Sequence, residues 1–110
     1  LSYFIERIHQ EYRDDIPIYV TENGMANNDQ ISSNEMIEDQ DRVEYFQLHL
    51  KEILDCLKKG IQVKGYFAWS LLDNYEWAFG YEKRFGLIHV DFETFKRTPK
   101  ISFNQFSKYL

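Results

Sequence analysis

The order of elements along this sequence predicts an α/β fold built on parallel strands. Two short runs rich in β-branched and aromatic residues, 16–22 and 63–69, are typical of strands. The amphipathic stretch between them, residues 41–59, has the spacing of a helix. A strand–helix–strand connection of this length makes the two strands parallel and the crossover right-handed.

The first strand ends at a carboxylate and a turn. Pro17 lacks a backbone donor and therefore belongs near the start of the strand. Asn23 and Gly24 tolerate positive φ, so the chain can turn away there. Glu22 would then lie at the carboxyl end of a parallel strand, where enzymes with such sheets keep their chemistry. The alternative is an ordinary turn with a solvated glutamate beside it.

Two segments flank this strand. Residues 1–13 have apolar side chains at helical spacing and predict a helix. Residues 25–40 are polar and irregular, and a loop of that length in a small domain is often functional. Because this loop follows the strand end, it is either a substrate lid or a tolerated surface insertion.

The long helix, 41–59, carries recognisable end signals. Asp41 and Glu44 form an acidic relative of the capping box, and Gly60 fits the residue past the end. Cys56 is expected to pack as a small apolar residue, and His49 to be packed or solvated rather than a metal ligand. The predicted apolar face comprises Val43, Phe46, Leu50, Ile53, Leu54 and Leu57.

Beyond the second strand, residues 70–81 form a dense loop of aromatic, amide and acidic side chains. Residues 85–91 are typical of a short extended segment that turns through 92–94. A final helix is predicted over 98–110, with Thr98 as its cap and Pro99 at its first position.

Length and composition exclude several classes of protein. The 110 residues, 44% of them hydrophobic, fit one small folded domain rather than a disordered chain. A net charge of -5 argues against nucleic acid or an anionic membrane as the main partner. No apolar run is long enough to span a bilayer, and no secretion signal is seen. Because no phosphate loop or metal-ligand cluster appears, no cofactor or metal is expected. The lone cysteine suits a reducing, cytoplasmic location, and a first residue other than Met suggests a fragment.

Polar and aromatic groups after both strands suit a sugar site. Glu22 follows the first strand, and Trp69, Asn74, Glu76 and Trp77 follow the second. An indole ring can lie against the C–H face of a pyranose, while a carboxylate accepts hydrogen bonds from its hydroxyls. The alternative for Trp69 is a core aromatic residue.

Two motifs carry a resemblance to the family-one β-glycosidases. Residues 19–25, YVTENGM, resemble that family's nucleophile motif. Residues 65–77, GYFAWSLLDNYEW, followed by Gly80-Tyr81 and by RFGL at 84–87, resemble its sugar-binding signature. Both occur in the family's order and spacing, from about residue 8 to the C-terminus. The resemblance implies the C-terminal quarter of a (β/α)8 TIM barrel, with its last two parallel strands and their helices, and retaining hydrolysis of β-glycosides.

The resemblance also implies residue roles. Glu22 would be the nucleophile that forms a glycosyl-enzyme intermediate, and Trp69 the platform under the sugar ring. Glu76 would bind the hydroxyls at carbons four and six, Trp77 a neighbouring hydroxyl, and Phe85 would close the pocket near carbon six. The peptide bond from Trp69 to the next serine is expected to be cis.

Glu76 further favours an unphosphorylated β-glucoside or related sugar, because its charge would repel a phosphate. Lys83 and Arg84 lie close enough in sequence to keep a 6-phospho-β-glycosidase as an alternative. The family's acid/base lies in an Asn-Glu-Pro motif, and here Asn34-Glu35 is followed by Met36. The chain alone is therefore expected to be inactive and to need the missing N-terminal barrel segment. A non-catalytic sugar- or protein-binding module and a generic small α/β domain are the other readings.

Overall fold

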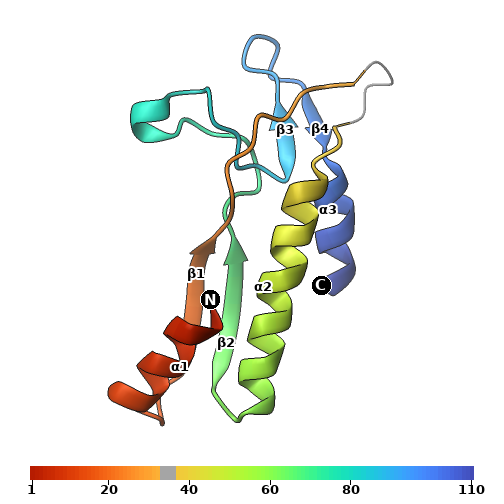
Figure 1. The fold of residues 1–110 in the computed structure, drawn as a ribbon. Coiled ribbons are helices and arrows are strands. Elements are labelled where there is room, and N and C mark those ends of the chain that lie inside the picture. The colour runs from red at the N-terminus through yellow and green to blue at the C-terminus, as the bar shows by residue number, and fades with distance from the viewer. Residues whose placement is uncertain (33–36) are drawn as a thin grey trace.

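Two parallel strands and the helix that connects them form the centre of the fold (Figure 1). The computed structural model describes residues 1–32 and 37–110. Strand β1 (Ile18–Asn23) pairs in parallel with strand β2 (Val63–Ala68). Helix α2 (Gln40–Lys58) connects them and lies along the pair. The parallel arrangement predicted from the strand–helix–strand order is confirmed.

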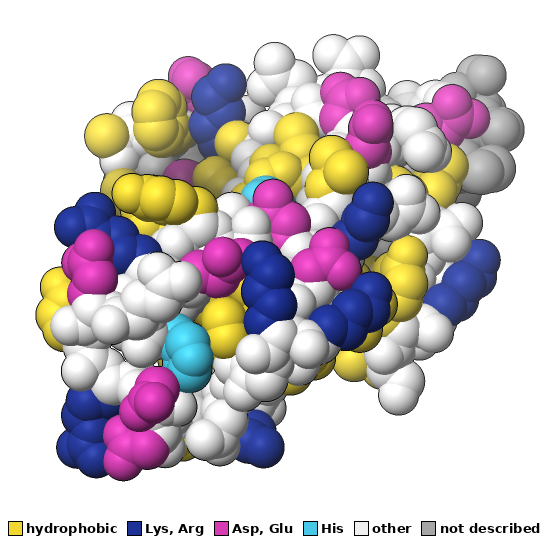
Figure 2. Space-filling view, turned by 60° about the horizontal axis from the view of Figure 1, so that its bottom comes forward, with side chains coloured by type: hydrophobic (Ala, Val, Ile, Leu, Met, Phe, Trp, Pro, Cys, Tyr) yellow, Lys and Arg dark blue, Asp and Glu magenta, His cyan; other side chains and the backbone are white. Residues whose placement is uncertain are grey.

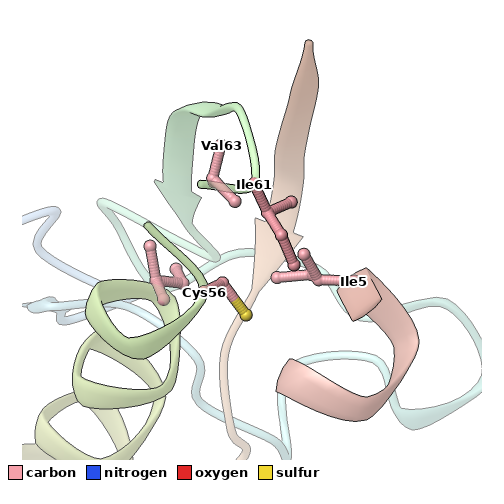
Figure 3. Close-up of a cluster of buried hydrophobic side chains, with 5 residues drawn as sticks. Ile5, Cys56, Ile61 and Val63 are labelled. Atoms are coloured by element: carbon pink, nitrogen blue, oxygen red, sulfur yellow. The ribbon is translucent and has the colours of Figure 1, made fainter. Parts of the chain in front are cut away.

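A small apolar core lies between the strands and two helices (Figure 3). Helix α1 (Ser2–Glu11) contributes Ile5, and α2 contributes Cys56, whose side chain is fully buried. Ile61, just before β2, and Val63, its first residue, pack against them together with Ile53 of α2. Cys56 thus packs as an apolar side chain, as predicted.

The start of α2 differs from the prediction. Its N-cap residue is Asp39, not a box formed by Asp41 and Glu44. The Asp39 carboxylate makes no cap hydrogen bond, because it binds the Arg42 guanidinium and the Ser102 hydroxyl instead. The predicted apolar face is buried only in part: Val43, Phe46 and Ile53 are buried, whereas Leu54 and Leu57 are exposed.

The C-terminal region also corrects a prediction. Strand β4 (Arg97–Pro99) pairs antiparallel with strand β3 (Ile88–Val90), so residues 97–99 are not the start of the final helix. Pro99 is tolerated there because it is the last residue of a short edge strand. Lys100 has extended backbone and binds the Leu87 carbonyl oxygen through its backbone N–H at 3.0 Å. Helix α3 therefore begins one residue later (Ile101–Phe106), and a 3-10 turn follows (Ser107–Tyr109).

The described part of the chain is elongated. Its radius of gyration is 16.0 Å and its extents are 48 × 30 × 18 Å. A compact chain of this length would have a radius of gyration of about 13 Å. Among the described helices, none is both long and apolar enough to cross a lipid bilayer. The Asn-Glu-Met stretch at 34–36 and the middle of the predicted lid lie outside the described residues.

Candidate active site

The site begins where β1 and β2 end side by side. The backbone N–H of Trp69 donates to the Asn23 carbonyl oxygen at 2.8 Å, so the pairing continues past β2. Gly24 then passes so close that an added Cβ would lie 1.8 Å from the Trp69 carbonyl oxygen. A side chain of any size is excluded at Gly24, and the segment after Glu22 is held against Trp69.

An irregularity in β1 sets the direction of Glu22. The register with β2 shifts between Val20 and Asn23. Val20 packs against the core, and the Asn23 side chain accepts a hydrogen bond from the Tyr66 hydroxyl at 2.7 Å. Strict alternation would put Val20 and Asn23 on opposite faces, so the shift changes the phase of the strand. Glu22 is left exposed at the strand end, while Asn23 is half-buried against Tyr66.

The segment after β2 is joined to the one that carries Phe85. The Trp69–Ser70 peptide bond is cis, which confirms the expectation for that bond. The backbone N–H of Ser70 donates to the Phe85 carbonyl oxygen at 3.2 Å, and its carbonyl oxygen accepts from the Leu87 N–H at 2.8 Å. The half-buried Trp69 and Phe85 therefore lie on neighbouring segments.

Glu76 lies in a tight turn. Its backbone N–H donates to the Gly80 carbonyl oxygen at 2.7 Å. Its carboxylate accepts a hydrogen bond from the Asn74 side-chain amide at 3.1 Å. Trp77, the first residue of the 3-10 turn η1 (Trp77–Phe79), has a left-handed φ of 44° and is 82% exposed. The structure therefore ties Glu76 to the residues after β2 and leaves the Trp77 ring in solvent.

A buried ion cluster lies beneath these segments, and the sequence analysis missed it. Asp73 is bound by Lys100 Nζ at 2.8 Å and by Arg84 Nη1 at 2.6 Å. Lys100 also binds Asp29, and Arg42 Nη2 lies 2.8 Å from the same Asp29 carboxylate. The side chains of all these residues except Arg84 are fully buried. The cluster joins the loop after β1 to the loop after β2 and to the starts of α2 and α3.

Asp73 is ionised within this cluster. Burial raises the pKa of its carboxyl, but the bonds from Lys100 and Arg84 outweigh burial and hold the pKa below its usual value. The backbone N–H groups of Gly86 and Val90 also donate to it, at 2.9 and 3.3 Å. Asp73 therefore holds together the two ends of the loop formed by residues 74–84, which carries Glu76.

Arg84 also joins this loop to the loop that follows β1. Its backbone pairs with that of Asn27, at 3.0 Å and 3.3 Å for the two N–H to carbonyl bonds. The loop that follows Glu22 is thereby fixed to the loop that carries Glu76. Within residues 1–32 and 37–110, no group of three or more His, Cys, Asp or Glu side chains is arranged to hold a metal ion.

Comparison with known proteins identifies this arrangement. The sequence model that describes glycosyl hydrolase family 1 matches residues 1–110. The chain belongs to glycosyl hydrolase family 1. The β-glucosidase from Thermotoga maritima in complex with castanospermine superposes with a TM-score of 0.93 at 40% identity, over 97% of this chain and 24% of that one. The fold is therefore part of a family 1 TIM barrel, as the motifs predicted.

Family 1 relatives of different specificity are similar to this chain. A bifunctional β-D-glucosidase/β-D-fucosidase from Bifidobacterium breve is 46% identical over 99 residues, covering 86% of this chain and 22% of the relative. A 6-phospho-β-galactosidase from Leptotrichia buccalis is 48% identical over 98 residues, covering 89% of this chain and 21% of the relative. The chain thus spans less than a quarter of the length of these two relatives.

Proposed function

We propose that this chain supplies the nucleophile and part of the sugar-binding surface of a retaining β-glycosidase for unphosphorylated β-glucosides or related β-glycosides. The observation that supports this best is the junction at the ends of β1 and β2. There the Trp69 N–H binds Asn23, and Gly24 lies against the Trp69 carbonyl group. A carboxylate and an indole are thereby held on adjacent strand ends, as a sugar platform beside a nucleophile requires.

Each proposed site residue has a role in that reaction. Glu22 attacks the anomeric carbon and forms the covalent glycosyl-enzyme intermediate, while the bond from that carbon to the leaving-group oxygen breaks and an acid/base protonates this oxygen. Water, deprotonated by the same acid/base, then hydrolyses the intermediate and frees Glu22. Trp69 supports the sugar ring, and Glu76 accepts hydrogen bonds from the hydroxyls at carbons four and six. Trp77 donates its indole N–H to a neighbouring hydroxyl, and Phe85 closes the pocket near carbon six.

A second carboxyl group is needed for turnover. Retaining glycosidases place an acid/base about 5–5.5 Å from the nucleophile. We propose that this group comes from the rest of the barrel, and that the 110 residues alone are inactive. The elongated shape supports this proposal, as do large apolar side chains that are exposed on the strands and α2: Tyr19, Phe67, Leu48, Leu54 and Leu57.

Neither nucleic acid nor a membrane is proposed as a partner. Figure 2 shows acidic and basic side chains interspersed over the end of the molecule that it presents, without a large patch of either sign. An ion pair of this kind joins Lys59 to Glu6 at 2.8 Å. A cytoplasmic location stays a prediction, supported by a single cysteine that is buried in the core.

The 6-phospho-β-glycosidase reading is the alternative, and the Leptotrichia relative is the reason to keep it. The environment of Arg84 argues against it. Its Nη1 atom is bound to Asp73 at 2.6 Å and to the Val90 carbonyl oxygen at 2.9 Å, and its side chain is only 19% exposed. A guanidinium committed in this way is poorly placed to bind a phosphate, and Glu76 would repel one.

A chimera tests the proposal. Residues 1–110 replace the segment that they match in the Thermotoga maritima β-glucosidase, and hydrolysis of aryl β-glucosides is measured beside their 6-phospho forms. The chimera is expected to hydrolyse the unphosphorylated substrate, and Glu22→Gln to abolish hydrolysis while circular dichroism stays unchanged. The isolated chain is expected to show no turnover. A folded chimera that retains its activity after Glu22→Gln, or that prefers the 6-phospho substrate, would contradict the proposal.

A further inference from the structure

We propose that Asn74 is a positioning residue that orients the Glu76 carboxylate for sugar binding, an inference that rests on the proposed function. Of the described residues, Asn74 is the one whose side chain donates a hydrogen bond to that carboxylate, at 3.1 Å. The backbone of Glu76 is held by Gly80, so the remaining freedom lies in its side chain. One hydrogen bond from Asn74 therefore decides which way the carboxylate points.

The surroundings of Asn74 require an amide with its nitrogen toward Glu76. Its Nδ2 atom donates both to Glu76 Oε2 and to the Tyr75 carbonyl oxygen, each at 3.1 Å. Its Oδ1 atom faces the Ser70 hydroxyl at 3.0 Å. A reversed amide would place its oxygen against two acceptors. An aspartate of the same size would do the same and would add a repelling charge.

Ser70 connects Asn74 and Glu76 to Trp69, the proposed sugar platform. It is buried, follows Trp69 directly, and is fixed through its backbone by Phe85 and Leu87. Its hydroxyl has one hydrogen, which is shared between the Leu72 carbonyl oxygen at 2.7 Å and Asn74 Oδ1 at 3.0 Å. The chain of contacts from Ser70 through Asn74 to Glu76 thus fixes the carboxylate relative to the residue beside Trp69. We infer that this relay sets the distance between the ring platform and the group that binds the hydroxyls.

A double-mutant cycle on the chimera tests this role. Asn74→Asp removes the donor without changing size, and Asn74→Ala removes it without adding charge. Each is expected to lower kcat/KM for an aryl β-glucoside by about 10-fold to 100-fold, the value of one hydrogen bond to a charged group. Asn104→Asp, on the exposed side of α3, is the matched control and is expected to leave kcat/KM unchanged.

The decisive measurement repeats both substitutions in a Glu76→Ala background. If Asn74 acts through Glu76, the substitutions there change kcat/KM by less than about twofold, because residues in one network are not additive. Equal losses in both backgrounds would show a merely structural role and overturn this inference alone. A folded chimera without hydrolysis of any aryl β-glucoside would overturn the proposed function, and this inference with it.

Discussion

Substitution Asp73→Asn tests the buried ion cluster as the support of the site. Asp39, which pairs with Arg42, belongs to the same cluster. In the described part of the chain the cluster thus balances three carboxylates, Asp29, Asp39 and Asp73, against Arg42, Arg84 and Lys100. The substitution keeps the size of the side chain but leaves one positive charge in excess. Removing one partner of a buried ion pair destabilises a protein by about 3–5 kcal/mol, because the remaining charge stays buried without compensation.

The free energy of unfolding of the chimera is measured by urea denaturation monitored by circular dichroism. Variants are compared where the m-value is unchanged, so that a shift in midpoint reports stability. Asp73→Asn is expected to lower the free energy of unfolding by about 3–5 kcal/mol. Asp14→Asn, the same change at an exposed site, should stay within about 0.5 kcal/mol of the parent. Adding Lys100→Met to Asp73→Asn removes the surplus charge and should recover part of the loss. A loss below about 1 kcal/mol for Asp73→Asn would refute the reasoning.

The remaining predictions concern pH, packing and reactivity. Because the folded pKa of Asp73 lies below its usual value, its stabilisation is complete above the unfolded pKa of about 3.9 and is lost as pH falls through the folded pKa. Acid titration of stability should therefore be steeper in the parent than in Asp73→Asn. Gly24→Ala should destabilise the chimera by at least about 1–3 kcal/mol in urea, because the new Cβ would meet the Trp69 backbone, and a normal midpoint would contradict that contact. Tyr66→Phe should lower stability by about 1 kcal/mol through the lost bond to Asn23, and an unchanged midpoint would show that bond to be unimportant. Cys56, fully buried with a pKa raised by burial, should react with thiol reagents far more slowly in the native chimera than in urea, and equal rates would show an open core.

The elements that local patterns specify could be predicted from the sequence. Runs of β-branched and aromatic residues identified β1 and β2, helical apolar spacing identified α2, and their order predicted the parallel pairing. Residues 97–99 could not be assigned in this way, because a capping threonine before proline suits a helix start as well as a short strand. Their partner strand is separated from them by a turn, and pairing at a distance leaves no periodic signal.

The candidate site residues came from two kinds of signal. Glu22, Trp69, Glu76 and Trp77 were indicated by their places after the two predicted strands, whereas Phe85 and the role of each residue came from the family motifs, and these roles remain proposals. The ion cluster gave no local signal, because isolated charged residues in polar stretches usually lie in solvent. Contacts such as that from Lys100 to Asp29, 71 residues apart in sequence, arise only when the loops have folded together.

The charge balance of the ion cluster has a consequence for divergence among homologues. A lineage that loses Asp73 keeps two cations that shared its carboxylate, the buried Lys100 and the partly exposed Arg84, so a second substitution at one of them becomes advantageous. These positions are expected to covary in family alignments even though none of them is proposed to touch the sugar. Residues proposed to bind the sugar are constrained by the substrate, whereas the members of this cluster are constrained by one another.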